Sequence, residues 1–170
     1  GKMMDIFVER IVERKKNIFD YMIIFSIFFG SLFVALLILL LLDINALSAM
    51  LLAALGYLVY YLISLRKIEY EYALTNGEID IDKIIAQRKR KRIFSANCRD
   101  FEVFGKLDSE KYTDEVKSIP QKIKAVTSMA SEDVHFFVAN YKGNKTLVFF
   151  EPDERMLNSL KPYISKRTVR

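Results

Sequence analysis

The sequence predicts an α+β membrane protein in which an N-terminal two-helix transmembrane hairpin precedes an antiparallel β-sheet or barrel with a C-terminal capping helix. Three features predict this architecture. Two uncharged apolar stretches of equal length lie close together in the first half of the chain. Runs with the alternation typical of strands fill most of the second half. One amphipathic helical stretch follows the last of these runs.

The transmembrane hairpin is predicted over residues 21–65, with spans at 21–42 and 44–65. A helix of either length reaches about 33 Å at about 1.5 Å per residue, enough to cross a hydrocarbon core of about 30 Å. A buried helical hairpin of a soluble protein is the first alternative, but the remaining chain is too small to cover so much apolar surface. A cleaved signal peptide is the second alternative. It is disfavoured because the apolar core of a signal peptide is usually shorter than this first stretch, and because here a second apolar stretch follows immediately.

The charges that flank the spans predict their orientation. Three basic residues at 14–16 precede the first span, Arg66 and Lys67 follow the second, and the connecting turn holds only the acid Asp43. Positive flanks stay on the cytoplasmic side. We therefore expect a two-pass protein of the cell membrane with both chain ends in the cytoplasm.

Small residues occur along both spans and have two interpretations. They could let the two backbones approach closely, or they could simply be tolerated in lipid. The residues concerned are Ser26, Gly30, Ser31, Ala49, Ala53 and Gly56.

The segment before the spans is predicted to form an amphipathic juxtamembrane helix over residues 3–20. Apolar residues that include Phe7 and Ile11 recur there at helical spacing, opposite charged residues that include Glu9 and Arg10. Such a helix lies at the headgroup level or packs on a neighbouring domain.

A cytoplasmic β domain is predicted over residues 66–165, followed by a tail at 166–170. The whole net charge of +5 belongs to residues 66–170, because residues 1–65 carry equal numbers of basic and acidic residues. Residues 68–75 alternate in polarity, and Asn76-Gly77 supplies the positive φ angles of a type I′ turn. This turn predicts a hairpin in which Leu74 faces Ile79.

The polar face of this hairpin gathers acids, and like charges on neighbouring strands destabilise a sheet. The acids are Glu69, Glu71, Glu78, Asp80 and Asp82. The basic run at 88–92 follows directly, and alternation places Arg88, Arg90 and Arg92 on one face of a strand and Lys89 and Lys91 on the other. One row could neutralise the acidic face. A calcium site built by the acids is disfavoured, because their spacing is that of a strand and not that of a calcium loop.

Three roles stay open for the basic run: contact with anionic lipid headgroups, recognition of a protein partner or a second copy, and salt bridging within the sheet. Nucleic acid is not expected as a partner, because few aromatic residues lie beside the run and a membrane tether disfavours it. The lipid bilayer itself is an expected partner. The binding candidates are Arg88, Lys89, Arg90, Lys91, Arg92, Arg66 and Lys67.

The rest of the domain is predicted to form further strands and one helix. Strand-like runs occupy 101–106, 123–130, 134–141 and 145–152, with the last two joined through a turn at 142–144. Asp153 can cap a final amphipathic helix, and Pro162 should distort its last turn.

This order of elements, with the "YALTNGEIDID" hairpin after a membrane hairpin, resembles the membrane-anchored bacterial PH-like domain proteins. "LTNGEI" resembles the family's strand-turn element, and the helix from Asp153 resembles the helix that plugs one end of its curved sheet. The chain is also similar to small membrane proteins of Gram-positive anaerobes. It departs from the usual PH-like pattern in its acidic first hairpin and its unbroken basic run.

The inventory of reactive residues predicts no enzyme. His135 is the only histidine and sits in an apolar strand, and Cys98 is the only cysteine. No nucleophile, phosphate-loop or metalloprotease motif is present, so we expect no catalytic residue, no metal and no cofactor. We therefore expect a non-enzymatic, membrane-anchored binding or scaffolding module. The alternative is an accessory subunit of a larger membrane complex such as a transporter.

Overall fold

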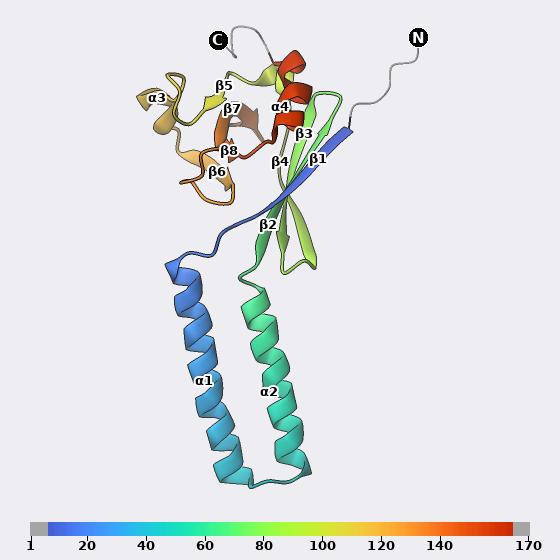
Figure 1. Cartoon of the computed structure of the whole chain (residues 1–170), viewed down its shortest axis with the longest axis vertical. Helices are drawn as coiled ribbons and strands as arrows, with labels where there is room; N and C mark the ends of the chain where they lie inside the picture. Colours follow the sequence, from blue (N-terminus) through green and yellow to red (C-terminus); the bar gives the residue numbers. More distant parts are fainter. Residues whose placement is uncertain (1–6, 165–170) are drawn as a thin grey trace. The chain divides into compact units, whose positions relative to one another are not determined.

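The computed structural model describes residues 7–164 (Figure 1). Residues 3–6 of the predicted N-terminal helix and the predicted tail at 166–170 lie outside this range. The chain divides into two compact units, one formed by residues 15–68 with 85–87 and the other by residues 1–14, 69–84 and 88–170. The predicted α+β class is confirmed, since two apolar helices precede β-sheets and a C-terminal helix.

The first unit is a hairpin of two helices, α1 (Ile18–Leu42) and α2 (Ala46–Ser64), which run side by side in opposite directions (Figure 1). Each helix begins with a capping box, in which two side chains and two backbone N–H groups pair reciprocally. Asn17 and Asp20 form the box of α1, and Asn45 and Ser48 form that of α2. The helix starts are therefore fixed by polar side chains at both ends of the hairpin.

The two helices meet along a narrow seam whose half-buried residues recur every three or four positions, as in a coiled coil. On α1 these are Ile24, Ile27, Ser31, Ala35, Ile38 and Leu42, and on α2 they are Leu52, Leu55, Val59 and Leu62. Of the small residues considered above, only Ser31 lies on the seam. A Cβ added at Gly30 or Gly56 would meet no other atom within 4 Å. The two glycines therefore do not hold the helices together.

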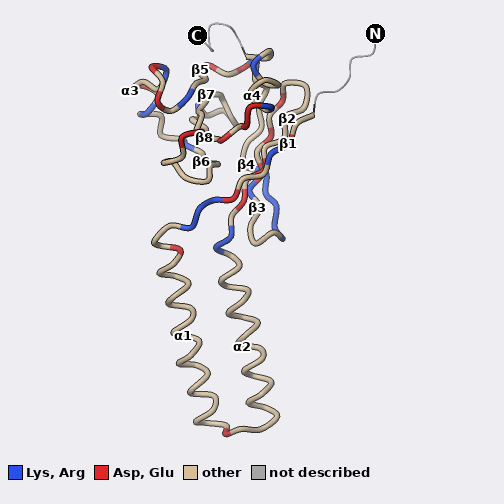
Figure 2. The backbone as a smooth tube through the Cα atoms, viewed as in Figure 1, with Lys and Arg blue, Asp and Glu red and all other residues tan. Residues whose placement is uncertain are grey.

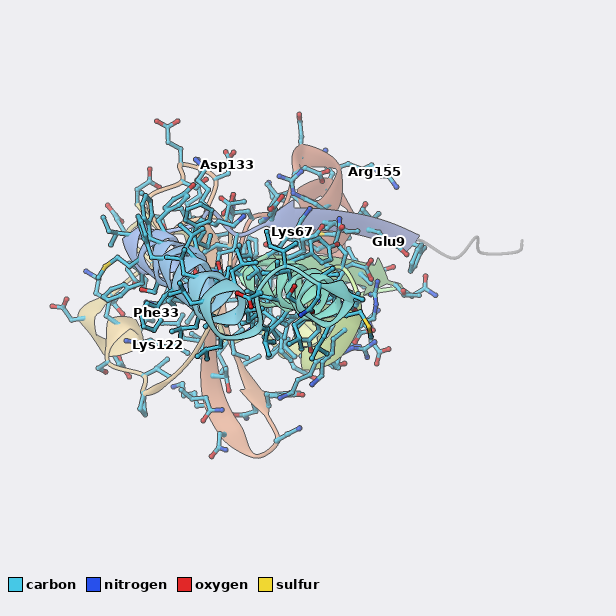
Figure 3. The ribbon with its side chains drawn as sticks, turned by 90° about the horizontal axis from the view of Figure 1, so that it is seen from below. Glu9, Phe33, Lys67, Lys122, Asp133 and Arg155 are labelled. Carbon is cyan, nitrogen blue, oxygen red and sulfur yellow. The ribbon has the colours of Figure 1, made fainter. Side chains whose placement is uncertain are left out.

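The remaining surface of the hairpin is apolar and exposed. Figure 2 shows that α1 and α2 carry almost no charged residues along their length. Both helices are long and apolar enough to cross a membrane, and almost none of their residues are buried. Side chains project around both helices, among them Phe33, which is 64% exposed (Figure 3). A core helix of a soluble protein would instead be mostly buried.

The second unit begins with a strand, β1 (Phe7–Glu13), where the sequence predicted a helix. That prediction is wrong for these residues. Val8 and Val12 are buried, whereas Phe7 and Ile11 are exposed on the opposite face. A separation of four residues fits a helix and a strand equally well, because four is also a multiple of the two-residue period of a strand. Antiparallel pairing with the next strand, with Val8 opposite Leu74, decides between the two.

The first sheet has the order β1-β2-β3-β4, where β2 spans Ile68–Thr75, β3 Glu78–Ile85 and β4 Lys89–Asn97. Asn76 and Gly77 join β2 to β3 with φ angles of 49° and 90°, as the predicted type I′ turn requires. Alternate residues of β2 and β3, such as Tyr72, Leu74 and Ile79, are fully buried. One face of this sheet therefore lies on the core.

The second sheet has the order β5-β7-β8-β6. Its strands are β5 (Val103–Lys106), β6 (Gln121–Ala125), β7 (His135–Tyr141) and β8 (Asn144–Phe150). β6 pairs with β8 in parallel, so this sheet is mixed and not purely antiparallel as predicted. The turn through Lys142 and Gly143 joins β7 to β8, as expected.

The central strands β7 and β8 are buried on both faces, which explains their nearly continuous apolar sequence. One face packs on the first sheet, with the ring centroids of Phe94 and Phe137 5.3 Å apart. The other face, with Phe136 and Phe149, is covered by Val116 of the short helix α3 (Asp114–Lys117) and by Ile119. The domain is thus two packed sheets with a further layer over the second.

The last described elements are α4 (Glu154–Leu160) and the 3₁₀ turn η2 (Lys161–Tyr163). The Asp153 side chain accepts a hydrogen bond from the N–H of Met156 at 2.8 Å, so it caps α4 as predicted. The α-helix stops at Leu160, and Pro162 lies in the tighter turn that follows. Met156 and Leu160 are fully buried, and they anchor the helix to the domain.

Candidate functional site

Lys89 to Arg92 of the basic run begin β4, and Arg90 and Arg92 contact the acidic face of the first sheet. Arg90 donates hydrogen bonds to Glu71 of β2 and to Asp82 of β3, at 2.5 and 3.1 Å. Arg92 donates to Asp82 at 2.6 Å and lies 3.6 Å from Asp80. Ser95 adds a hydrogen bond to Asp80. The predicted neutralisation of the acidic face by one basic row is therefore present.

The hydrogen bonds hold both arginines firmly in the charged form. The bond to Glu71, with that to Asp82, raises the pKa of Arg90, and the bond to Asp82 raises that of Arg92. Both arginine side chains are about half exposed, at 51% for Arg90 and 53% for Arg92. Such pairs on the surface contribute modestly, so their main effect is to remove the repulsion between neighbouring acids.

The lysines of the run are arranged differently. Lys89 and Lys91 are exposed and form no ion pair with any residue in the described range 7–164. Arg88 precedes the strand and is also exposed. The charge that this strand offers to a partner therefore comes chiefly from the two lysines.

The remaining binding candidates, Arg66 and Lys67, belong to the helical unit. Arg66 donates to Asp20, which is fully buried, through Nε at 2.9 Å. This ion pair joins the first turn of α1 to the residues that follow α2. Lys67 is half-buried, and its carbonyl accepts from the N–H of Ala86 at 2.9 Å. Arg66 thus has a structural partner within its own unit.

A cavity with a volume of about 750 Å³ lies elsewhere in the β domain. It is bounded by β1, β5, the start of β7, and the segment from Pro152 to Lys161. Phe104 and Leu157 supply apolar surface, and the charged or titratable lining residues are Arg10, Lys106, Asp133, His135, Asp153, Glu154 and Lys161. Its size is typical of small-molecule sites.

His135 is the titratable group most enclosed by this cavity, with only 8% of its surface exposed. Its Nδ1 lies 2.8 Å from the carbonyl oxygen of Asp133, which stands on the loop before β7 (Figure 3). The rings of Phe104 and Phe150 pack against the imidazole. Burial, with a contribution from Lys106 and Lys161, lowers the pKa of His135.

Two of the lysines that line the cavity form no ion pair within the described residues. These are Lys106 and Lys161. Arg10, in contrast, donates to the carbonyl of Glu151 at 2.8 Å and lies 3.7 Å from Asp153.

Sequence reasoning placed His135 in a strand but did not find this cavity. The reason is that its charged residues come from segments nearly the whole domain apart, at Arg10, Lys106 and Lys161. No spacing in the sequence indicates that these positions meet. Cys98, the other residue considered, is a buried thiol whose pKa burial raises to about 12, so it is unreactive.

The described part of the domain thus has two packed sheets with a final helix, exposed lysines on β4 and a cavity beside His135. The chain belongs to the family described as Bacterial PH-like domain (DUF6106), whose match covers residues 4–170. PH-like domains are typically non-catalytic binding modules, which agrees with the expected class. No curated protein and no solved structure matches the chain.

Proposed function

We propose that the chain is a two-pass protein of the cell membrane whose PH-like domain lies in the cytoplasm and serves as a non-enzymatic binding or scaffolding module. The observation that carries this proposal is the hairpin of α1 and α2. Both helices have spanning length and an exposed apolar surface. Both flanks of the hairpin are basic, at residues 14–16 and 66–67, which favours the cytoplasmic side for each.

The ion pair of the buried Asp20 with the partly exposed Arg66 supports the same topology. Asp20 lies in the first turn of α1 and Arg66 just after the end of α2, so the pair is at the end of the hairpin that carries the basic flanks. A charged pair of this kind is tolerated near the end of a span, where the arginine reaches the interface, and is costly at its centre. The pair thus suits a hairpin that enters and leaves the bilayer from one side.

Membrane integration of the full chain tests the proposal. After expression in bacteria, the chain should stay in the membrane pellet through an alkaline carbonate wash. The double variant Phe33→Arg and Leu51→Arg, with each arginine costing about 2.5–3.5 kcal/mol inside a bilayer, should integrate poorly. The matched variant Phe33→Leu and Leu51→Ile should behave as the parent chain does. Release of the parent chain by the wash would contradict the proposal.

We further propose that Lys89 and Lys91 contact anionic headgroups, because both lysines are exposed and neither forms an ion pair with an acid of the described residues. Each cation near such a surface contributes about 1 kcal/mol. In nanodiscs, hydrogen exchange over β4 should be slower with anionic lipid than with phosphatidylcholine. Salt should remove the difference, because it screens exposed charges.

The control for this test uses lysines of another strand. Lys89→Gln with Lys91→Gln should abolish the lipid effect, whereas Lys122→Gln with Lys124→Gln on β6 should keep it. Equal exchange in both lipids would instead favour a protein partner for the run. The accessory-subunit alternative predicts stoichiometric membrane partners on purification in mild detergent.

A further inference from the structure

Neither the membrane hairpin nor the lysines of β4 explains the cavity beside His135, whose charged lining residues indicate a ligand site. We propose that this cavity binds a dianionic oxyanion of the phosphate type, held between Lys106, Lys161 and the imidazole of His135. Such a group could belong to a lipid headgroup or to a free phosphorylated molecule. The inference does not depend on the membrane tether or on the lysines of β4.

The hydrogen bonds of His135 leave one ring nitrogen for a ligand. Nδ1 faces the carbonyl of Asp133 at 2.8 Å, and a carbonyl can only accept, so Nδ1 carries the proton. Nε2 makes no hydrogen bond with any residue from Phe7 to Ile164. A second proton would turn Nε2 into a donor. An imidazolium formed in this way can then donate to an anion.

The charges around the ring favour an anion and not a cation. At His135 the combined effect of Lys106 and Lys161 on the pKa exceeds the opposing effect of the Asp133 carboxylate. Asp153 is committed to the cap of α4 and to Arg10. Glu154 is the remaining acid of the lining. The field at the imidazole is therefore positive, and a bound anion would relieve it.

The size of the cavity and its charge set the class of ligand. Lys106, Lys161 and a protonated His135 place N–H donors around the cavity, against the carboxylates of Asp133 and Glu154, and several donors suit the multiple oxygens of a phosphate better than the two of a single carboxylate. A volume of about 750 Å³ exceeds the needs of a bare phosphate. The apolar surface of Phe104, Pro152 and Leu157 can accept the rest of a phosphorylated molecule.

Binding of this kind must be linked to protonation of His135. If the anion binds the imidazolium more tightly than the neutral ring, the anion raises the pKa of His135, and acidification strengthens binding by the same factor. A rise of about half a pKa unit corresponds to a roughly threefold difference in affinity between the two forms. His135 is the only histidine of the chain, so its NMR signal reports the site without assignment.

The experiment uses the full chain in maltoside micelles, purified with a tag that lacks histidine and labelled with ¹³C-histidine. The pKa of His135 is measured in sodium sulfate and in sodium chloride at equal ionic strength. Sulfate is the probe because its charge stays constant across the titration. We expect a higher pKa in sulfate. The difference should vanish in Lys106→Gln with Lys161→Gln and persist in Lys122→Gln with Lys124→Gln.

A second arm separates the two sources of the ligand. Nanodiscs that contain phosphatidic acid, a phosphate monoester, are compared with nanodiscs that contain phosphatidylserine at matched surface charge. A higher His135 pKa with phosphatidic acid identifies a lipid headgroup, and an effect of sulfate alone identifies a free anion. An equal pKa in sulfate and chloride together with no effect of phosphatidic acid, or a sulfate effect that survives loss of both cavity lysines, would overturn the inference.

Discussion

Single buried polar groups join the two sheets of the domain. The hydroxyl of Tyr72, on β2, donates to the carbonyl of Ala125 at the end of β6, and it accepts from the N–H of Glu151 at 3.0 Å. The Glu151 carboxylate accepts from the N–H and the hydroxyl of Thr127 and from Ser131. Burial raises the pKa of Tyr72, so the hydroxyl stays protonated and can serve both neighbours.

Tyr72→Phe tests this arrangement at the scale of one atom. The substitution keeps the packed ring but leaves the N–H of Glu151 and the carbonyl of Ala125 without this partner. We expect the free energy of unfolding to fall by about 2 kcal/mol, the usual cost of an unsatisfied buried group. Chemical denaturation in detergent measures it. A loss below about 0.5 kcal/mol, as for an ordinary surface change, would show that the hydroxyl does not link the sheets.

At the scale of the element, the carboxylate of Asp82 on β3 adds side-chain hydrogen bonds from Arg90 and Arg92 to the pairing of β3 with β4. Asp82→Asn preserves the shape of the side chain but removes its charge. We expect a loss of about 0.5–1 kcal/mol of stability, the upper part of the range for exposed pairs, because Asp82 accepts from both Arg90 and Arg92. Lys89→Gln is the control and should change stability by less than about 0.5 kcal/mol.

A double-mutant cycle separates this pairing from a general effect of charge. Asp82→Asn should cost less in an Arg92→Gln background than in the parent chain, because the partner is already lost. Equal costs in the two backgrounds would mean that Asp82 acts without Arg92.

The elements differ in how far the sequence predicts them. The turn at Asn76-Gly77 and the salt-bridged row of β4 follow from local rules, since both depend on residues close in sequence. β1 does not, because the spacing of Val8 and Val12 fits two periods and only the edge of β2 selects the strand. The cavity around His135 is likewise absent from any local pattern, because its cations converge only through the packing of distant segments.

At the scale of the whole molecule, the apolar helical hairpin follows β1 and precedes β2 in the chain, so both of its ends continue into the PH-like domain. Whether the hairpin inserts into a membrane and on which side of that membrane the domain lies have different physical causes. The first depends on the apolar surface of α1 and α2, and the second depends on the basic flanks. The side decides which partners the domain can reach, and it is therefore the central claim.

Cysteine labelling measures that side directly. Ile44→Cys places a thiol in the turn between the helices, and Asp114→Cys places one on the surface of the domain. Cys98 can remain, because it is buried and unreactive, and the parent chain serves as the blank. With an impermeant maleimide on spheroplasts, we expect Ile44→Cys to be labelled and Asp114→Cys to be labelled only after permeabilisation. Labelling of Asp114→Cys in intact spheroplasts would contradict this expectation.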